Sequence, residues 1–519
     1  MLGSCKKFLN VEPIDALSGN NYWKNKDDAE TFTREIYRLF RLGVGINYPL
    51  HFIADTRNAP VLRTSNAAFV NYRRDIDMIS QGKIKDLVNT ARVQDADRYW
   101  QRHMEYDIVG NWAPIYKVIQ SANILYELVP KVAENDPTFS PAEVKKYQAE
   151  AVFMRCLTYL YLIRLYGDVP YYTNAYNQDA LPRTLHTQVA KNCLAELAKV
   201  KDDLPWTYDE PADRSVRAMR GSAIALMMHF NMWLAGFEPA VKDDCYAAVD
   251  QLGDELWNEG VVEQGAYELL PLNQVSTIFI GRSKEGLFEI PTNVNYGESY
   301  GQFIRKQYWA NVLHWPYFIL NPGFSQSGQQ ASELAYETSY MKTLYPEDVN
   351  DGRKDFFVDK GLSNTQTIYS GDYHFTNFKF FNLALGTNNN GSTVSLSSVV
   401  FRLADAILLQ AEADAELGYE DKAITLLNRI RSRANALPYP GSNNYDNNLK
   451  DAIYWERCKE LMGEGHYYWD LVRTKKILDG KYCWHPMSYS AYLQEAWTWP
   501  IDKSALTNNP FMTLNNYWN

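Results

Sequence analysis

The stretch LADAILLQAEADAELGYEDKAITLLNRIRSRA, residues 403–434, decides the fold class of this 519-residue chain. Its first half has an apolar or small residue on every helical turn: Leu403, Ile407, Ala411 and Ala415. Its second half repeats the pattern: Ala423, Leu427, Ile430 and Ala434. Both halves have the spacing of one helical face, and Gly418 between them is a typical helix stop. The stretch therefore predicts two helices with a short joint.

Small side chains at the predicted helix contacts refine this prediction. Ala411, Ala415 and Ala423 fall where the two helices must approach closely. Helices paired in this way are typical of tetratricopeptide hairpins, in which each pair buries its apolar face against the next. A strict repeat of constant length is absent from the sequence. We therefore predict a mainly α fold class, in which degenerate tetratricopeptide-like helical hairpins form a scaffold.

Comparable periodicity predicts helices through much of the N-terminal half. Ser140-Pro141-Ala142-Glu143 supplies an N-cap and a proline at the first helical position of one of them. The stretch 223–237 is the most apolar, but it contains His229 and Asn231 and is too short to span a bilayer. We interpret it as part of a buried helix. The predicted helices cover residues 27–40, 112–126, 140–165, 189–204, 216–234 and 243–257.

Residues 259–399 have a different composition from the helical parts. Helical periodicity fades there, while Gly, Asn, Ser and aromatic residues increase. Long loops within a compact domain are usually functional or disordered, and the interleaved aromatic residues favour ordered, functional loops. We also expect short strands in this segment, for example at 287–291.

Charge and motifs argue against several classes of function. The net charge is −10 and no basic face dominates, so nucleic-acid binding is not expected. The glycine motifs of phosphate and dinucleotide sites, the serine-hydrolase elbow and the H-E-x-x-H pair are absent from the sequence. The six cysteines form no C-x-x-C pair and the eight histidines are scattered, so we predict no cofactor and no metal. A catalytic carboxylate pair has no characteristic sequence spacing, and we predict no enzymatic activity.

Aromatic residues are abundant: the chain has 14 Trp, 37 Tyr and 22 Phe residues, 14% of its length. Trp and Tyr combine a flat apolar face with a polar group, so they suit surfaces that stack on sugar rings or peptides. Tyr also covers contacts between helices, and the composition alone leaves both explanations open.

Four segments together resemble the SusD/RagB family of outer-membrane nutrient-binding lipoproteins. Residues 2–13 resemble its lipoprotein cleavage site and mature start, with Cys5 at the cleavage position. Asn111-Trp112 with Tyr116, Ile119 and Asn123 resembles an early helix signature. The third segment joins AEAVFMR (149–155) to RLYGDVP (164–170). The fourth comprises Glu456-Arg457, Glu460-Leu461, Gly463-Glu464-Gly465 and WDLVR (469–473).

The resemblance extends from residue 2 to about 473, with weaker companions at 351–354 and 401–405. Two departures lie near the end of the chain. Pro-Ile-Asp at 500–502 replaces the Pro-Ile-Pro that is usual in the family, and 514–517 replaces its closing Gln-Asn-Pro pattern. We interpret the charged signature residues as helix-to-helix ion pairs and caps rather than ligand contacts: Glu150, Arg155, Glu456, Arg457 and Arg473.

The resemblance implies a lipoprotein on the cell surface, held in the outer membrane by acylation of Cys5. Such a protein captures nutrient and delivers it to a TonB-dependent, SusC-like transporter. We predict an oligosaccharide or polysaccharide as ligand; a peptide-binding member of the same family and a helical glycoside hydrolase are the alternatives. The implied organisation is a lipoprotein N-terminus and linker at 1–20 and one SusD-like domain at 21–519. That domain has helix pairs at about 21–258 and 400–480 and a loop-rich ligand-binding insertion at about 259–399.

Two segments combine aromatic rings with polar side chains that suit ring hydroxyls. Such partners are needed because an unpaired buried polar group costs about 1–3 kcal/mol. The predicted ligand-binding residues of the first segment and its continuation are Asp55, Arg57, Asn71, Tyr72 and Trp100. Those of the second segment are Tyr296, Trp309, Trp315 and Tyr317, with the two tryptophans as the strongest stacking candidates. Arg57 is equally compatible with a transporter contact or a solvated surface.

Overall fold

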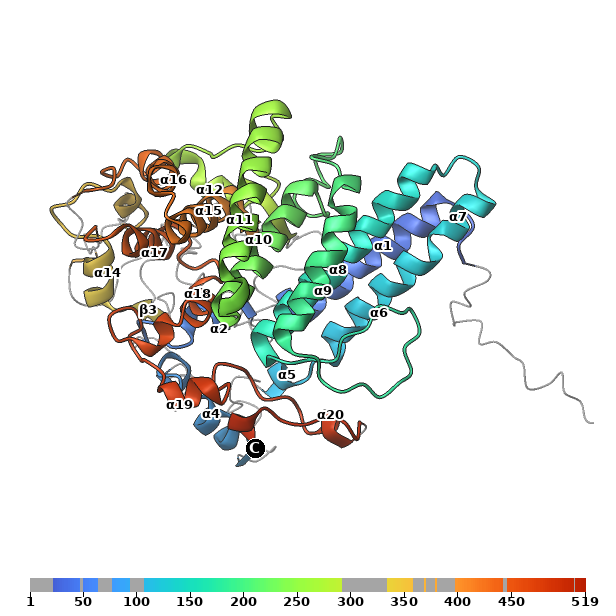
Figure 1. The fold of residues 1–519 in the computed structure, drawn as a ribbon, viewed down its shortest axis with the longest axis horizontal. Helices are drawn as coiled ribbons and strands as arrows, with labels where there is room; N and C mark the ends of the chain where they lie inside the picture. Colours follow the sequence, from blue (N-terminus) through green and yellow to red (C-terminus); the bar gives the residue numbers. More distant parts are fainter. Residues whose placement is uncertain are drawn as a thin grey trace, which may run out of the picture.

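A computed structural model gives the fold of the chain. It describes residues 22–46, 50–63, 77–93, 107–291, 334–357, 368–369, 379, 397–441, 446–507 and 509–519. Helices dominate these residues (Figure 1), so the predicted mainly α fold class is confirmed. No helix in this part of the chain is long and apolar enough to cross a membrane.

One group of helices contains much of the N-terminal half of the chain (Figure 1). It comprises α1 (Lys26–Phe40), α6 (Ala113–Leu128), α8 (Pro141–Tyr166) and α9 (His186–Val200), which lie side by side. The Ser140 side chain accepts a hydrogen bond from the Glu143 N–H, and the Glu143 carboxylate accepts one from the Ser140 N–H. This capping box and the following proline confirm the predicted start of α8.

Helix α8 is the centre of this group. Every side chain from Ala149 to Tyr166 is buried, because α6 and α9 cover different sides of the helix. Two charged residues in this run have partners: Glu150 pairs with Arg217 at 2.8 Å and Arg155 with Glu196 at 2.7 Å. The predicted ion-pair role of these two signature residues is confirmed.

The predicted helical hairpin is also present. It consists of α15 (Leu403–Leu417) and α16 (Glu420–Arg433), and Gly418 between them has a φ of 83°, the left-handed conformation in which glycine is favoured. Helices α10 (Arg220–Phe237) and α11 (Lys242–Glu255) lie between this hairpin and the first group (Figure 1). A Cβ on Gly253 of α11 would lie 2.4 Å from the Gln410 side chain, so glycine permits α11 and α15 to pack closely.

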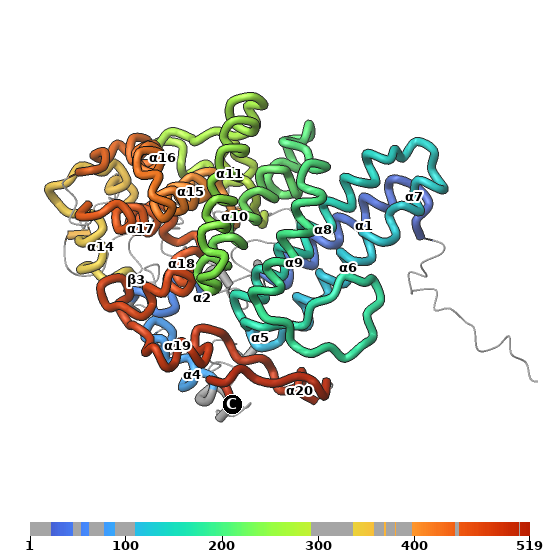
Figure 2. The backbone as a smooth tube through the Cα atoms, viewed as in Figure 1, coloured from blue at the N-terminus to red at the C-terminus, as the bar shows by residue number. Residues whose placement is uncertain are grey.

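The C-terminal part folds back on the beginning of the chain. Helices α17 (Leu449–Glu460) and α18 (Tyr467–Arg473) follow the hairpin, and α18 contacts α2 (Leu50–Thr56). Figure 2 shows this N-terminal helix beside the C-terminal one. The shorter helices of the described residues are α4 (Ile84–Val93), α5 (Asp107–Gly110), α7 (Pro130–Asn135), α12 (Val275–Ile278), α14 (Thr338–Leu344), α19 (Tyr489–Leu493) and α20 (Ser504–Thr507).

The largest differences between predicted and observed helix ends occur in two helices. The helix predicted at 189–204 begins at His186, and its last turn is a 3-10 turn at Lys201–Asp203. The helix predicted at 216–234 begins at Arg220, since Met219 has extended backbone and its N–H donates to the Ser222 hydroxyl. A capping hydroxyl does not change the spacing of apolar residues, so that spacing alone predicts a helix start that is too early.

Among the described residues, four short strands form two separate antiparallel ribbons. In one, β1 (Val61–Arg63) pairs with β3 (Leu334–Tyr336). In the other, β2 (Gly286–Pro291) pairs with β4 (Ser397–Arg402). The strand expected at 287–291 is therefore confirmed, and its partner lies more than a hundred residues later in the sequence.

Candidate functional site

The β1–β3 ribbon joins the two segments in which ligand residues were predicted. Its register places Val61 opposite Tyr336 and Arg63 opposite Leu334. The chain leaves β1 after Arg63 toward the segment with Asn71 and Tyr72, and it enters β3 from the segment with Trp309, Trp315 and Tyr317. The described residues that flank the predicted ligand segments, Arg63 and Leu334, are thus opposite each other in one ribbon.

The β2–β4 ribbon holds the opposite end of the second segment. Pro291, the last residue of β2, lies opposite Ser397, the first residue of β4. The chain continues from Pro291 into residues 292–333. The Pro291 carbonyl also accepts a hydrogen bond from Arg41 Nε at 2.7 Å. Residues 292–333 are therefore attached to the scaffold at one ribbon on each side.

Most of the predicted ligand-binding residues lie outside the residues that the structure describes. These are Asn71, Tyr72, Trp100, Tyr296, Trp309, Trp315 and Tyr317, and Cys5 lies outside them as well. The other two are described: Asp55 is in the last turn of α2, and Arg57 follows that helix, just before the first ribbon.

Arg57 is in the protein interior, where its side chain is 2% exposed. Its guanidinium donates to the backbone carbonyls of Trp497 at 3.0 Å, Thr498 at 3.1 Å and Ala496 at 2.5 Å. It also lies over the Tyr468 ring, 4.8 Å from the centroid. These contacts attach the end of α2 to the C-terminal segment, so they give Arg57 a structural role that sequence reasoning did not foresee.

Asp55 is also buried, and its partner is a backbone group. Its Oδ2 accepts from the Gly465 N–H at 2.7 Å, while Oδ1 has no hydrogen-bond partner in the part of the chain that the structure describes. Burial raises the pKa of Asp55 well above its ordinary range, against the opposing effect of the Gly465 N–H. Asn58 Nδ2 similarly donates to the His485 carbonyl at 2.7 Å. The residues just before β1 are thus fixed by backbone groups of the C-terminal part.

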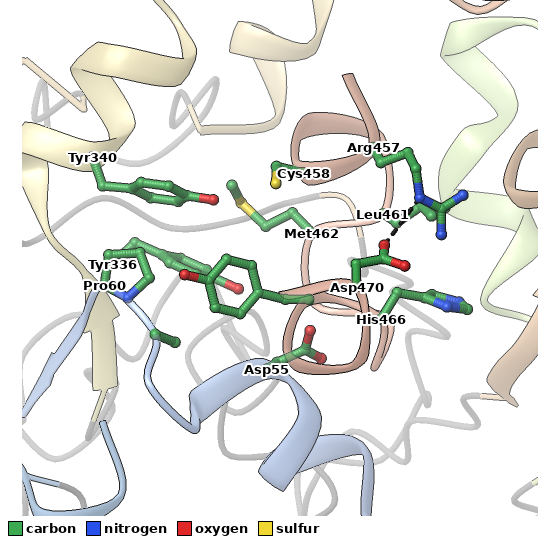
Figure 3. A pocket seen from close by; sticks show the side chains of 12 residues that line it. Asp55, Pro60, Tyr336, Tyr340, Arg457, Cys458, Leu461, Met462, His466 and Asp470 are labelled. Carbon is green, nitrogen blue, oxygen red and sulfur yellow. Dashed lines mark hydrogen bonds and ion pairs between the residues drawn. The ribbon is translucent and has the colours of Figure 1, made fainter. Parts of the chain in front are cut away.

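Asp55 lines a small cavity beneath the β1–β3 ribbon (Figure 3). Figure 3 shows its carboxyl group pointing in from α2, while Tyr340 enters from the opposite side. The cavity has about 20 Å³ of internal space, which is room for about one water molecule. A sugar ring does not enter a space of this size. Other lining residues that sequence reasoning missed are Pro60, Tyr336, Tyr340, Cys458, Met462 and Tyr467.

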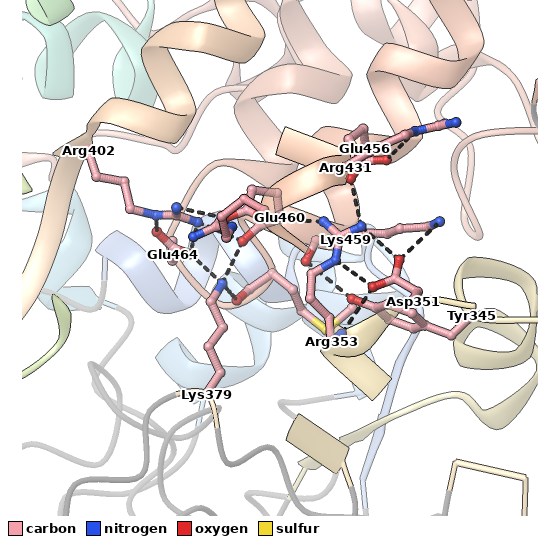
Figure 4. A network of polar contacts seen from close by, with 12 residues as sticks. Tyr345, Asp351, Arg353, Lys379, Arg402, Arg431, Glu456, Lys459, Glu460 and Glu464 are labelled. Atoms are coloured by element: carbon pink, nitrogen blue, oxygen red, sulfur yellow. Dashed lines mark hydrogen bonds and ion pairs between the residues drawn. The ribbon is translucent and has the colours of Figure 1, made fainter. Parts of the chain in front are cut away.

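The C-terminal signature forms a buried group of ion pairs around α17, here called the α17 charge network (Figure 4). Arg353 pairs with Glu456 at 2.6 Å and with Glu460 at 3.1 Å, and Arg402 pairs with Glu464 at 2.6 Å. The acidic members are Glu285, Asp351, Asp446, Glu456, Glu460 and Glu464; the basic members are Arg353, Lys379, Arg402, Arg431, Arg433 and Lys459.

Pairing decides the charge state of this network. Burial acts to raise the pKa of Glu460, but Arg433, Arg402 and Arg353 outweigh burial and hold that pKa below its ordinary range. Every acidic member therefore faces a cation, and no carboxylate of the network is left to bind a ligand. The predicted ion-pair role of Glu456 is confirmed.

A second buried group unites the N-terminal and C-terminal signatures. Arg457 pairs with Asp405 at 3.0 Å and with Asp470 at 2.9 Å, and Arg473 pairs with Glu412 at 2.6 Å. His229 Nε2 lies 2.7 Å from Asp405, and Arg164 Nη2 lies 3.0 Å from His229 Nδ1. The predicted ion-pair roles of Arg457 and Arg473 are confirmed.

This group includes His229, Asp405 and His466, whose potential ligand atoms lie within 4.8 Å of one another. Its chemistry does not suit a metal ion. Arg164 can only donate, so His229 Nδ1 accepts and Nε2 carries the proton that faces Asp405. The guanidinium groups of Arg164 and Arg457 also repel a cation.

Asp168, His186 and Glu495 form another such group within the described residues. The Trp233 indole N–H donates to His186 Nδ1 at 3.1 Å, so Nε2 carries a proton and offers no lone pair to a metal. Burial lowers the pKa of His186 to about 4, against Asp168 and Glu238, so the ring is neutral near pH 7. This group is therefore interpreted as hydrogen-bonded packing.

Comparison with known proteins agrees with the signatures. A solved structure of a SusD homologue from Bacteroides thetaiotaomicron is 37% identical, covers 95% of this chain and 99% of its own, and has a TM-score of 0.80. The chain belongs to the SusD/RagB family. Two family models match parts of this SusD/RagB protein: "SusD family" at residues 329–518 and "Starch-binding associating with outer membrane" at residues 56–231.

More distant relatives show how widely this SusD/RagB fold occurs. A SusD-like protein from Formosa agariphila is 24% identical over 99% of this chain and 96% of its own length. A structure described as a laminarin-binding SusD-like protein is 19% identical, covers 93% of this chain and 98% of its own, and has a TM-score of 0.65. At that identity the second comparison supports the fold alone.

Proposed function

We propose that this SusD/RagB protein is a binding protein that captures oligosaccharide or polysaccharide at the cell surface and delivers it to a TonB-dependent, SusC-like transporter. The ligand surface in this proposal is formed by the segment that follows β1 and the segment between β2 and β3. It includes Asn71, Tyr72, Tyr296, Trp309, Trp315 and Tyr317, with Trp100 nearby.

The observation that supports this proposal most strongly is the register of the β1–β3 ribbon. The two segments share an aromatic and polar composition, and they are far apart in sequence. Arg63, which precedes the first, lies opposite Leu334, which follows the second. A ligand surface formed by both segments requires that the residues flanking them lie close together in the fold.

The chemistry of sugars favours this composition. A sugar ring presents apolar C–H faces, which a flat Trp or Tyr covers with little loss of side-chain entropy. The hydroxyl groups around the ring need hydrogen-bond partners such as Asn or Asp. Starch appears in the description of one matching family model and laminarin in the description of one related structure. A glucan is therefore the first ligand class to test.

The membrane part of the proposal depends on Cys5. Its acylation attaches the chain to the outer membrane, and a bacterial lipoprotein needs more than one acyl chain for stable anchoring. The description of the second family model refers to association with the outer membrane, which supports this location. The domain organisation proposed for this arrangement is a linker at 1–20 followed by one SusD-like domain.

Calorimetric titration with starch-derived and laminarin-derived oligosaccharides, alongside a pool of peptides, tests the proposal. We expect saturable heat with at least one glucan series and none with the peptides. Binding to peptides alone would instead assign the chain to the peptide-binding alternative.

The same mixtures also test the glycoside hydrolase alternative. We expect no release of reducing ends during prolonged incubation with the polysaccharides. Turnover that disappears on replacing one carboxylate would show that the chain is an enzyme.

A further inference from the structure

Glu289 is a buried acidic residue close to the start of the 292–333 segment. It lies on β2, two residues before Pro291, and is 1% exposed. Its Oε1 accepts from the Arg282 N–H at 2.8 Å and from the Ser397 hydroxyl at 3.1 Å. Its Oε2 is buried and has no hydrogen-bond partner among the described residues. One carboxyl group thus connects β2, the first residue of β4 and the turn that follows α12.

The turn is shaped around this contact. Gly281 has a φ of 99°, and a Cβ there would lie 2.3 Å from Ser397 Oγ and 2.4 Å from Glu289 Oε1. The Ser397 N–H also donates to the Phe279 carbonyl at 2.8 Å. Glycine therefore lets the turn approach the carboxyl group closely, and Ser397 binds to both.

The surroundings of Glu289 provide no ion pair. Arg282 is the charged residue that faces it in the described part of the chain, and the Arg282 guanidinium is directed to the Ala212 carbonyl at 3.0 Å. By contrast, Glu285, just before the same strand, pairs with Arg402 at 2.7 Å. Burial raises the pKa of Glu289 to about 7, while the Arg282 N–H and the Ser397 hydroxyl act to lower it.

We propose that Glu289 is a proton-dependent clasp beside the start of the 292–333 segment. The neutral carboxyl group keeps Ser397 and the 279–282 turn together. When the carboxyl group ionises, the charge on Oε2 has no donor in the interior, so the Pro291–Ser397 end of the ribbon opens to hydrate it.

The direction of the pH effect follows from linkage. In the open form Glu289 has an ordinary pKa near 4.5, whereas in the closed form burial raises its pKa to about 7. Between these values opening releases a proton, so the opening constant rises about tenfold per pH unit and levels off above pH 7. The clasp is therefore strongest at acidic pH and weakest above neutrality.

Hydrogen exchange of the full chain without ligand tests the clasp from pH 5 to pH 8.5. The measured quantity is the protection of peptides covering 279–290 and 397–402, corrected for intrinsic exchange. We expect protection in the native protein to fall about tenfold per pH unit up to pH 7 and then level off. Glu289→Gln keeps an uncharged group of the same shape, so its protection should not depend on pH. Glu268→Gln is the matched control, because Glu268 is 56% exposed, and it should behave as the native protein.

Equal pH dependence in the native protein and Glu289→Gln would overturn the proposal. Protection that stays constant in the native protein between pH 5 and pH 7 would overturn it even if the variant did not fold. The consequence for the ligand rests on the function proposed above: an oligosaccharide that binds the closed ribbon should restore protection at pH 8. If the chain binds no glycan, the pH dependence of hydrogen exchange is unaffected. Failure of the proposed function can therefore be distinguished from failure of the clasp.

Discussion

The α17 charge network and the bases of the two ribbons both contain buried acidic side chains, but these side chains have different kinds of partner. In the network, Glu456, Glu460 and Glu464 are buried, and each faces one or more cations. At the ribbon bases, Asp55 and Glu289 are also buried, but their hydrogen bonds come from uncharged groups. One oxygen of each has no partner within the described ranges.

This difference separates two kinds of buried acid. The neighbouring arginines hold the pKa values of Glu460 and Glu464 below the ordinary range, so these two paired acids stay charged. Unpaired acids have a raised pKa, so they respond to protons in a range where the network does not. The α17 charge network thus contains residues of the C-terminal signature, whereas Asp55 and Glu289 lie close to the two ribbons that flank the predicted ligand segments.

The largest expected effect comes from breaking the network. Arg402 is fully buried and pairs with Glu285, Glu460 and Glu464. Replacing Arg402 with Met leaves three buried carboxylates short of a cation, which should lower the free energy of unfolding by about 3–5 kcal/mol. Urea denaturation at pH 7 measures this change.

An exposed ion pair provides the control for Arg402→Met. Arg38 pairs with Glu35 at 2.6 Å, but their side chains are 54% and 44% exposed. Arg38→Ala should change the free energy of unfolding by less than about 0.5 kcal/mol. Equal effects of the two substitutions on the free energy of unfolding would mean that a buried ion pair is no more important for stability than an exposed one, contrary to the comparison above.

A smaller effect is expected in the predicted ligand segment. Trp315→Ala should weaken binding of the best oligosaccharide by about 1–3 kcal/mol without a change in melting temperature, because the ring is predicted to stack on sugar rather than on the scaffold. Calorimetry measures the affinity, and a thermal scan measures the stability.

Trp257 provides a matched tryptophan outside the predicted segments. Its ring stacks on the Arg429 guanidinium, 3.6 Å from the centroid. Trp257→Ala should leave the oligosaccharide affinity unchanged. Unchanged affinity in Trp315→Ala as well would remove Trp315 from the ligand surface.

Helices and their ends were largely predictable from sequence, because apolar periodicity and capping residues are local signals. The start of α8 at Pro141 and the joint at Gly418 are examples. The strand at 287–291 was also expected, but its pairing with residues 397–402 was not. The sequence of a six-residue strand does not indicate which distant segment it pairs with.

The candidate site was less predictable than the fold. An ion-pair role for Arg457 follows from its signature, whereas the partners Asp405 and Asp470 depend on the packing of three helices. Arg57 is of a residue type that suits ligand binding. Only the fold reveals that its guanidinium donates to the carbonyls of Ala496, Trp497 and Thr498. Glu289 likewise has no sequence signal, because its raised pKa comes from burial.

The central claim is that two segments remote in sequence form one ligand surface, supported by the pairing of their flanking residues Arg63 and Leu334 in the β1–β3 ribbon. Hydrogen exchange with and without saturating oligosaccharide tests this claim most directly. We predict that the ligand protects residues 64–76 and 296–318 together, while protection within α8 is unchanged. Protection of one segment without the other, or of neither, would contradict the account.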